Sequence, residues 1–382
     1  MKPVNRVFIN LLALVAVTIC ASAQNDENIV RVLKQKTPVL CLAFSPDGSL
    51  LAGGGEDHKI QIWDPATGEI VQSFEQHTQP VRSLEFSADG ELLLSAAGTS
   101  ILLWNRNNQA IRSFRGHTTL IWNVTFSHDE QQVISTSLKN IFTIWDTETA
   151  KKITTLNGHT KSTLAVDASS DGTLLASGSL DQTIVIWDYG THEILRTINA
   201  HAGNIYSLCF SPDNTQLASA SMDGTAKTWD VQSGRIIHLL EGHSYAVMQA
   251  DYSPDGSYII TASYDKTARL WETATGKSLY VFGDHEDVLN AATFSPDGRY
   301  IATASQDGTI IIWQMSPRYI AEAYYWPEIQ SEFDQAEILR PKEKSESRAE
   351  YAERMSAAEK YREEIYLKYY NRHMEELKEE GH

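Results

Sequence analysis

One set of polar residues recurs at a fixed spacing in the second half of this chain. Each copy holds a histidine, a serine or threonine 18 residues later, and an aspartate four residues after that. The four copies are His159, Ser177 and Asp181; His201, Ser219 and Asp223; His243, Thr261 and Asp265; and His285, Thr303 and Asp307. These residue types make up the triad of serine hydrolases, in which serine attacks, histidine takes its proton and aspartate orients the histidine. A hydrolase needs one nucleophile, one oxyanion hole and one substrate pocket, so four identical copies favour a structural role over a catalytic one.

A tryptophan follows each set at constant distance, and the same series extends towards the N-terminus. Its members are Trp63, Trp104, Trp145, Trp187, Trp229, Trp271 and Trp313, at intervals of 41 or 42 residues. Each tryptophan ends a short apolar run, and aspartate follows it in four of the seven cases. Self-similarity at this period is typical of a repeat architecture, in which each unit is one supersecondary element.

The phased tryptophans, aspartates and histidines resemble the WD40-repeat family over about residues 29–314. The resemblance implies an all-β fold, a seven-bladed β-propeller. It also implies that each His, Ser or Thr, Asp and Trp set is a buried hydrogen-bond chain running from the indole through the hydroxyl and the imidazole to the turn aspartate.

The residues of a single unit support the same architecture. The unit at 205–240 has four short runs with strand character, at 205–210, 216–221, 225–230 and 235–240, separated by Pro, Gly, Asp and Asn turns. Tight turns between short strands predict a four-stranded antiparallel sheet, and such sheets bury both faces only by stacking radially. The last repeat lacks an outer strand after Trp313, and residues 29–33 match the outer strands of the other units. We therefore expect this N-terminal strand to complete the seventh blade and close the ring.

The first three repeats depart from the pattern. Repeat one has Gly53 in the serine position and no histidine near Gln35, repeat two lacks the turn aspartate, and repeat three carries Lys139 in its place. Each missing partner removes a buried hydrogen bond of roughly 0.5–1.5 kcal/mol. We expect blades one to three to be the less stable arc of the ring.

The chain divides into three segments on composition. Residues 1–23 have a charged start, an apolar run from Val7 to Cys20 and the small-residue site Ala21-Ser22-Ala23, which predicts an exported protein with a cleaved signal peptide. A retained anchor and lipidation at Cys20 are the alternatives. Residues 24–315 form the propeller, and 316–382 form a charged helical extension. The mature chain would keep only Cys41 and Cys209, far apart in the ring, so we expect free thiols.

The C-terminal extension predicts two helices. A short one begins at Ser316-Pro317 and is expected to end at Trp326-Pro327. A longer one is expected from near Ser347, with Glu350 completing a capping box, to about Glu380. Its apolar stripe is expected at Tyr351, Met355, Ala358, Ile365 and Tyr369, and its supporting i,i+4 pairs at Glu350–Arg354 and Glu364–Lys368. Packing on the propeller, helix-mediated self-association and partner binding are three uses that the sequence leaves open.

The net charge of −17, from 32 basic and 49 acidic residues, argues against nucleic acid and anionic membranes as partners. No metal-ligand cluster and no unique clustered acid, base or nucleophile stands out, so no cofactor, metal or enzymatic activity is expected.

The WD40 resemblance further implies a binding face at one end of the ring, at two positions in each blade. The first set, five residues after the repeat histidine, is Leu40, Arg82, Trp122, Leu164, Tyr206, Met248 and Asn290. The second set, before the turn aspartate, includes Leu180, Met222, Tyr264 and Gln306. Aromatic and apolar residues in blades three to six suggest anchors for a protein or peptide, although side chains turned into the core are the alternative. The favoured function is an exported, non-catalytic scaffold that uses this face, the C-terminal helix or both. The alternative is an envelope enzyme or a small-ligand sensor that uses the central channel.

Overall fold

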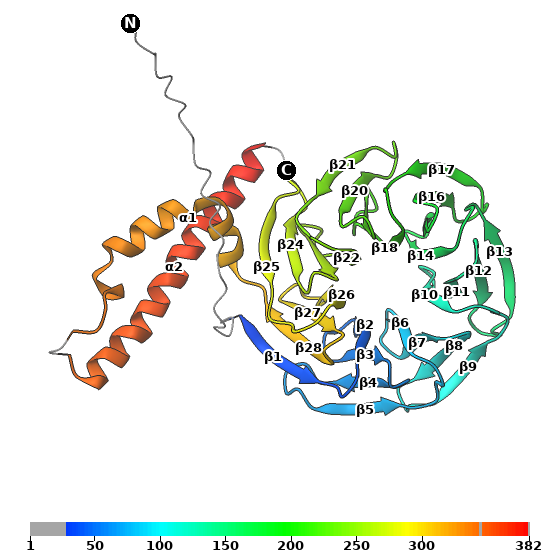
Figure 1. Cartoon of the computed structure of the whole chain (residues 1–382), viewed down its shortest axis with the longest axis horizontal. Coiled ribbons are helices and arrows are strands. Elements are labelled where there is room, and N and C mark those ends of the chain that lie inside the picture. Colours follow the sequence, from blue (N-terminus) through cyan, green and yellow to red (C-terminus); the bar gives the residue numbers. More distant parts are fainter. Residues whose placement is uncertain (1–27, 344–345, 381–382) are drawn as a thin grey trace, which may run out of the picture.

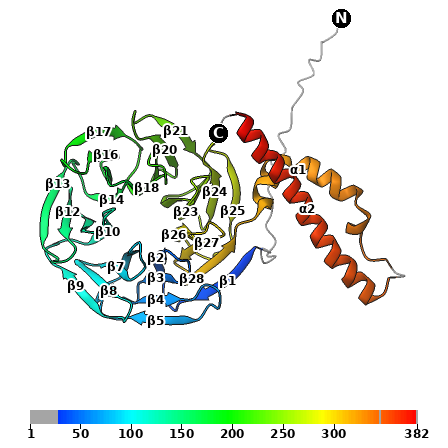
Figure 2. The same cartoon turned by 180° about the vertical axis from the view of Figure 1, so that it is seen from behind.

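The computed structural model describes residues 28–343 and 346–380, so the predicted signal peptide lies outside the described residues. Within this part, 28 strands surround a central axis as seven blades, and two helices project from one side of the ring (Figures 1 and 2). The strands form five four-stranded antiparallel sheets and one eight-stranded sheet. The predicted seven-bladed propeller with a C-terminal helical extension is confirmed.

The four strands of each blade run outwards from the axis, and each ring of equivalent strands holds one member per blade. The innermost strands are β2 (Val39–Phe44), β6 (Val81–Phe86), β10 (Ile121–Phe126), β14 (Thr163–Ala168), β18 (Ile205–Phe210), β22 (Val247–Tyr252) and β26 (Leu289–Phe294). The second strands are β3 (Leu51–Gly55), β7 (Leu92–Ala97), β11 (Gln132–Ser137), β15 (Leu174–Ser179), β19 (Gln216–Ser221), β23 (Tyr258–Ser263) and β27 (Tyr300–Ser305).

The outer half of every blade is built in the same way. The third strands are β4 (Ile60–Trp63), β8 (Ser100–Asn105), β12 (Ile141–Asp146), β16 (Thr183–Asp188), β20 (Ala226–Asp230), β24 (Ala268–Glu272) and β28 (Thr309–Gln314). The outermost strands are β5 (Ile70–Phe74), β9 (Ala110–Phe114), β13 (Lys152–Asn157), β17 (Ile194–Asn199), β21 (Ile236–Leu240), β25 (Ser278–Phe282) and, for blade seven, β1 (Ile29–Lys34).

Strand β1 closes the ring, as predicted. It pairs antiparallel with β28, with Ile29 opposite Trp313 and Leu33 opposite Ile310. Leu33 is buried in the core between blades one and seven, while its neighbours Val32 and Lys34 are exposed. The N-terminal strand therefore covers the edge of the last repeat with backbone pairing and adds one apolar side chain to the core.

The repeat tryptophans are buried, each between its own sheet and a neighbouring one. In blade one the ring of Trp63 lies so close to Gly53 that a Cβ on that glycine would approach it to 2.8 Å. The space that a serine side chain would need in the first repeat is thus occupied by the tryptophan ring.

Blades three and four are the two that share one sheet. A single bridge, Ser137 opposite Thr163, joins β11 to β14. The backbone N–H of Thr163 also donates to the carbonyl of Lys139 at 2.7 Å. The altered turn of repeat three therefore lies directly against the next blade.

The first helix of the extension is longer than predicted. Helix α1 spans Pro317–Gln335, with the Ser316 side chain capping its start, and it continues through Pro327 with a kink at Tyr325. The break expected at Trp326-Pro327 is present as this kink, and a second helical segment that the sequence analysis did not predict continues to Gln335. Proline cannot donate to the carbonyl four residues back, that of Ala323, and this oxygen instead accepts from the Lys277 ammonium of the loop before β25 at 2.6 Å.

The second helix begins where the sequence predicted. Helix α2 spans Arg348–Glu380, and the short 3₁₀ turn η1 (Glu337–Leu339) precedes it. Ser347 and Glu350 form a capping box, with backbone-to-side-chain distances of 2.8 and 3.2 Å. The two predicted i,i+4 pairs are wrong, because tertiary partners compete: Arg354 pairs with Glu346, and Lys368 with Glu332 of α1.

The helices pack on each other and on the propeller. Ile365 and Tyr369 of α2 lie in a cluster with Tyr325 and Ile329 of α1. Tyr319 of α1 is fully buried in the core that blades six and seven share. Of the three uses left open, packing on the propeller is the one seen in this structure (Figure 1).

Four tyrosines fasten this pair of helices, and each donates to a glutamate. The pairs are Tyr324–Glu272, Tyr325–Glu376, Tyr366–Glu322 and Tyr369–Glu332, at 2.5–2.9 Å. A cation also lies over each of the four rings. The pairs are Lys277 over Tyr324, Arg372 over Tyr325, Arg318 over Tyr366 and Lys368 over Tyr369. Aromatic packing, hydrogen bonding and charge thus act at the same positions.

Candidate functional site

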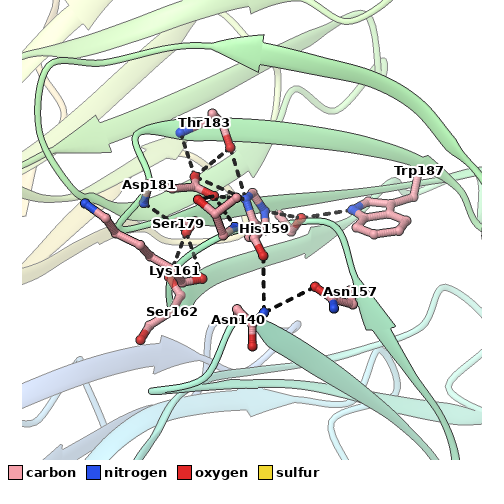
Figure 3. A network of polar contacts seen from close by, with 11 residues as sticks. Asn140, Asn157, His159, Lys161, Ser162, Ser179, Asp181, Thr183 and Trp187 are labelled. Carbon is pink, nitrogen blue, oxygen red and sulfur yellow. Dashed lines mark hydrogen bonds and ion pairs between the residues drawn. The ribbon is translucent and has the colours of Figure 1, made fainter.

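The phased polar residues form hydrogen-bonded chains. In blade four, Trp187 Nε1 donates to Ser177 Oγ at 2.9 Å, His159 Nε2 lies 2.8 Å from that oxygen, and His159 Nδ1 lies 3.2 Å from Asp181 (Figure 3). A carboxylate accepts the Nδ1 proton, which leaves Nε2 to accept from the hydroxyl. Asp181 also accepts from the backbone of Thr160 and Thr183, so it ties the loop to the turn.

The other three complete copies have the same geometry. His201, His243 and His285 lie 2.9–3.1 Å from Asp223, Asp265 and Asp307, and 2.7–2.8 Å from Ser219, Thr261 and Thr303. Trp229, Trp271 and Trp313 donate to the same hydroxyls at 2.8–2.9 Å. All four hydroxyl residues are fully buried, so a substrate cannot reach the atom that a hydrolase would use as its nucleophile. The sets are structural.

Burial sets the protonation of these chains. It lowers the pKa of His159, His201 and His243, so these imidazoles are neutral at pH 7. Burial opposes ionisation of Asp181, but hydrogen bonds from Thr183 and Thr160 and the nearby His159 outweigh it and lower the pKa to about 2. The acid is therefore charged and the base neutral across the physiological range.

The first three blades complete the chain only in part. His77 and His117 lie 2.7 Å from Ser95 and Ser135, but without an aspartate, and burial lowers the pKa of both imidazoles to about 4. For His117, the charge of Lys139 adds to the effect. In blade one, Gln35 replaces the histidine and its amide donates to Asp57 at 3.1 Å.

The predicted binding positions share one structural device. In every blade the pairing of the innermost with the second strand is irregular, and the residue expected on the face lies in the irregularity, between Ile205 and Ser207 in blade five for example. The same break occurs in the other six blades. A bulge re-aims a side chain, and in six of the seven blades the residue in the irregularity lines the channel. We call the end of the ring where the innermost strands begin the upper rim.

Most of the predicted residues meet at this rim. Trp122 and Tyr206 stack at 5.9 Å with their planes 21° apart, and the Arg82 guanidinium lies 5.4 Å from the indole centroid. These side chains line one cavity of about 440 Å³ together with Leu40, Met248, Tyr264 and Asn290. The two aromatic rings belong to blades three and five, so only the closed ring brings them together.

Leu164 is the exception. Its side chain is 2% exposed and does not line the cavity, so its place among the binding residues is wrong. The carbonyl of Leu164 accepts from the Thr136 hydroxyl of blade three at 2.5 Å. This hydrogen bond holds the start of β14 against blade three, and the Leu164 side chain points into the core.

The channel below the rim holds acids that the sequence analysis missed. Glu85, Asp167 and Asp251 occupy the same position in the innermost strands of blades two, four and six, and all line the cavity. Glu85 and Asp167 accept from the backbone N–H of Phe126 and Phe210 in the next blade, at 3.3 and 2.7 Å. Asp251 accepts from Cys209 and from Thr293. A comparison of one strand position across all blades would have found these acids.

Burial raises the pKa of these carboxyls, to about 8 for Glu85 and about 7 for Asp167. Residues 28–343 and 346–380 contain no group of three or more His, Cys, Asp or Glu side chains placed to hold a metal ion. Both cysteines in this part are free thiols. No helix in the same part is long and apolar enough to cross a membrane.

Comparison with known proteins agrees with this geometry. The family described as "WD domain, G-beta repeat" matches seven times, at residues 27–64, 68–105, 108–146, 150–188, 192–230, 234–272 and 276–314. The chain belongs to the WD40-repeat family. WD40 propellers are in general non-enzymatic scaffolds for protein–protein interaction.

Relatives of this WD40 protein are matched over part of their length. Nuclear distribution protein nudF of Aspergillus oryzae is 35% identical over 116 residues, which is 29% of this chain and 26% of that protein. WD repeat and SOCS box-containing protein 1 of Homo sapiens is 30% identical over 109 residues, 28% of this chain and 26% of that protein. The chain thus spans about a quarter of the length of these curated relatives, and the likeness lies in the repeats.

Proposed function

We propose that this WD40 protein is a non-catalytic scaffold that binds a protein or peptide at the upper rim of blades two to six. The observation that carries the proposal is the stack of Trp122 on Tyr206 at the mouth of the channel, beside Arg82. Tyr264, which lines the same cavity, is 41% exposed, and Leu138 and Met222 in the turns of blades three and five are 44 and 55% exposed. Exposed apolar side chains grouped around aromatic residues and an arginine are typical of the central part of a protein interface.

Hydrogen bonds that hold the loops of the upper rim also favour binding there. In blades four to six the His–Asp pairs hold its loops in place, as Asp223 accepts from the backbone N–H of Ala202 at 2.9 Å. Loops held in this way lose little conformational entropy on binding, which favours affinity.

A small ligand in the central channel is the second candidate. The cavity of about 440 Å³ and the carboxyls of Glu85, Asp167 and Asp251 favour it. Against it, each of these acids already accepts a hydrogen bond from a neighbouring residue, which gives it a structural task.

Alanine variants at the rim test the proposal. Trp122→Ala, Tyr206→Ala and Tyr264→Ala are each expected to weaken capture of a partner from cell extract by roughly 1–2 kcal/mol. Trp326→Ala and Leu367→Ala are the matched controls, because they remove exposed apolar side chains from the helices. If capture survives the triple rim variant but is lost in the helix variants, the helices are the binding element. Thermal unfolding of every variant checks that the fold is intact.

We further propose that the protein is exported and that its mature form begins at Gln24. The charged, apolar and small-residue parts of residues 1–23 support this location. N-terminal sequencing of the protein recovered from the envelope is expected to start at Gln24. Lipidation would instead give a chain that starts at Cys20 and carries acyl groups, and an intact Met1 on all molecules would refute export.

A further inference from the structure

The upper rim of blades two to four carries four basic side chains: Arg82, Arg115, Lys139 and Lys161. They lie at one end of the ring, because antiparallel register places the start of β10, at Ile121, opposite the end of β11, at Ser137, and Lys139 lies in the turn that follows. Arg115 and Lys161 belong to the loops that lead into β10 and β14. Arg115, Lys139 and Lys161 are exposed to solvent.

These cations have no carboxylate partner. Among residues 28–343 and 346–380, none of the four forms an ion pair. The Nε of Arg82 is buried and lacks any hydrogen-bond acceptor. Some exposed basic groups elsewhere in the same part of the chain are paired, as Lys59 is with Glu75 at 2.5 Å, whereas others, such as Lys36 and Lys152, are not.

The acids of this rim are not free to neutralise them. In the loop and turn segments 75–80, 97–100, 115–120, 137–140, 157–162 and 179–182, the acidic residues are Glu75 and Asp181. Glu75 pairs with Lys59, and Asp181 pairs with His159. Lys139 itself stands where the other blades carry their turn aspartate. The corresponding loops and turns of blades six, seven and one carry more acids, including Glu241, Glu286, Asp287 and Glu56, together with Lys36, Lys59 and Lys266.

The contrast matters because the whole chain carries a net charge of −17. A basic sector on so acidic a protein does not follow from its composition. It also adjoins the apolar part of the rim, since Leu138 precedes Lys139 directly and the Arg82 guanidinium covers Trp122. Unpaired cations beside a half-buried indole and an exposed aliphatic group are complementary to a chain segment that combines carboxylates with an apolar anchor.

We propose that the rim of blades two to four recognises an acidic peptide segment that carries an aromatic or aliphatic anchor. The inference rests on the proposed function and adds the chemistry of the partner. The anchor packs on Trp122 and Leu138, and the flanking carboxylates pair with Lys139, Lys161 and the guanidinium of Arg82. Rim ion pairs are screened by salt, so binding weakens as ionic strength rises.

Selection from a random library of 12-residue peptides displayed on phage tests the chemistry, with the immobilised full chain as bait. Aspartate and glutamate next to Trp, Phe or Leu are expected to be enriched. Enrichment of lysine and arginine, of uncharged sequences, or of no sequence would overturn the inference.

The Lys139→Asp variant separates charge from folding. It places an acid where other blades have one, so the variant is expected to unfold at or above the temperature of the native protein. Its affinity for the selected acidic peptide, measured by fluorescence anisotropy, is expected to fall roughly ten-fold. Lys152→Asp on β13, an equally exposed lysine of the same blade, is the matched control and should leave affinity unchanged.

Two further outcomes are decisive. If the peptide is lost in Trp122→Ala but binds Lys139→Asp and Lys161→Glu with native affinity at all salt concentrations, the charge inference fails while the proposed function stands. If instead a fluorescein-labelled oligothymidylate binds the same rim and is lost in Lys139→Asp, the sector serves a nucleic acid, and the peptide inference is overturned.

Discussion

His373 of α2 and Glu272 of β24 lie 101 residues apart in the chain, and 2.6 Å separate the imidazole Nε2 from the carboxylate Oε1. Both side chains are buried. Glu272 also accepts from the Tyr324 hydroxyl of α1 at 2.5 Å. It directly follows a repeat tryptophan, at the position where four of the seven repeats have aspartate. Glu272, whose side chain is longer than the aspartate of the other repeats, thus joins both helices to blade six.

The Glu272→Gln variant is expected to loosen the helices. It leaves His373 without its acid in a buried site, which should lower the free energy of unfolding by roughly 1–3 kcal/mol. Hydrogen exchange of α1 and α2 measures the loss of protection directly, with Glu193→Gln on the exposed surface as the control. Unchanged protection of both helices would show that the Glu272 contacts do not hold them.

The same contact should be lost in acid. Burial opposes ionisation of Glu272, but hydrogen bonds from Thr275, Tyr324 and His373 outweigh it and lower its pKa. An acid with a lowered folded-state pKa contributes stability above its ordinary pKa of 4.5, and this stability is lost as the pH falls. We expect protease sensitivity at the connection between α1 and α2 to rise below pH 4.5, and less so in Glu272→Gln.

Removal of a turn aspartate should destabilise the ring. Asp223→Ala and Asp265→Ala each leave a buried histidine and a loop N–H without their hydrogen-bond acceptor. Each variant is expected to lower the free energy of unfolding, measured in urea, by roughly 1–3 kcal/mol. Asp334→Ala, an exposed acid of α1, is the control. A variant that kept full stability and lost a measurable hydrolytic activity would reverse the structural assignment.

The buried acids of the channel predict that the protein loses folding stability as the pH rises. Burial raises the pKa of Glu85 to about 8, so the native state holds this proton more tightly than the unfolded state. The resulting stability is present below pH 4.5 and is lost as the pH rises to about 8. Glu85→Gln should therefore make the unfolding temperature less dependent on pH between 5 and 9, whereas Glu69→Gln, at an exposed site, should not. Identical pH profiles for Glu85→Gln and the native protein would contradict the prediction.

Ring closure can be tested at a single side chain. Leu33→Ala should cost roughly 2–5 kcal/mol, because a cavity forms between blades one and seven. Val32→Ala, on the exposed side of the same strand, should have little effect. Deletion of residues 24–33 opens the edge of β28 and is expected to lower the unfolding temperature or cause aggregation. Equal stability of the two point variants would argue that β1 contributes backbone pairing alone.

The repeat spacing determined most of the fold in advance. Seven phased tryptophans, turn residues between short runs and an orphan N-terminal strand predict the propeller and its closure, because these signals are local and return seven times. The capping box of α2 is equally local, since Ser347 and Glu350 are three residues apart. The buried hydrogen-bond chains follow from the WD40 resemblance together with the constant spacing of their members.

Only the tertiary structure decided what depends on contacts between distant segments. The helix resumes after the kink at Tyr325, and the Lys277 ammonium donates to the carbonyl of Ala323 that Pro327 leaves without an intrahelical donor. Leu164 points into the core, since the backbone of blade four is held against Thr136 of blade three. The three channel acids and the stack of Trp122 on Tyr206 combine residues from alternate blades. These residues come together only because the ring closes. The distances between alternate blades are set by the geometry of the ring and cannot be predicted from spacing along the sequence.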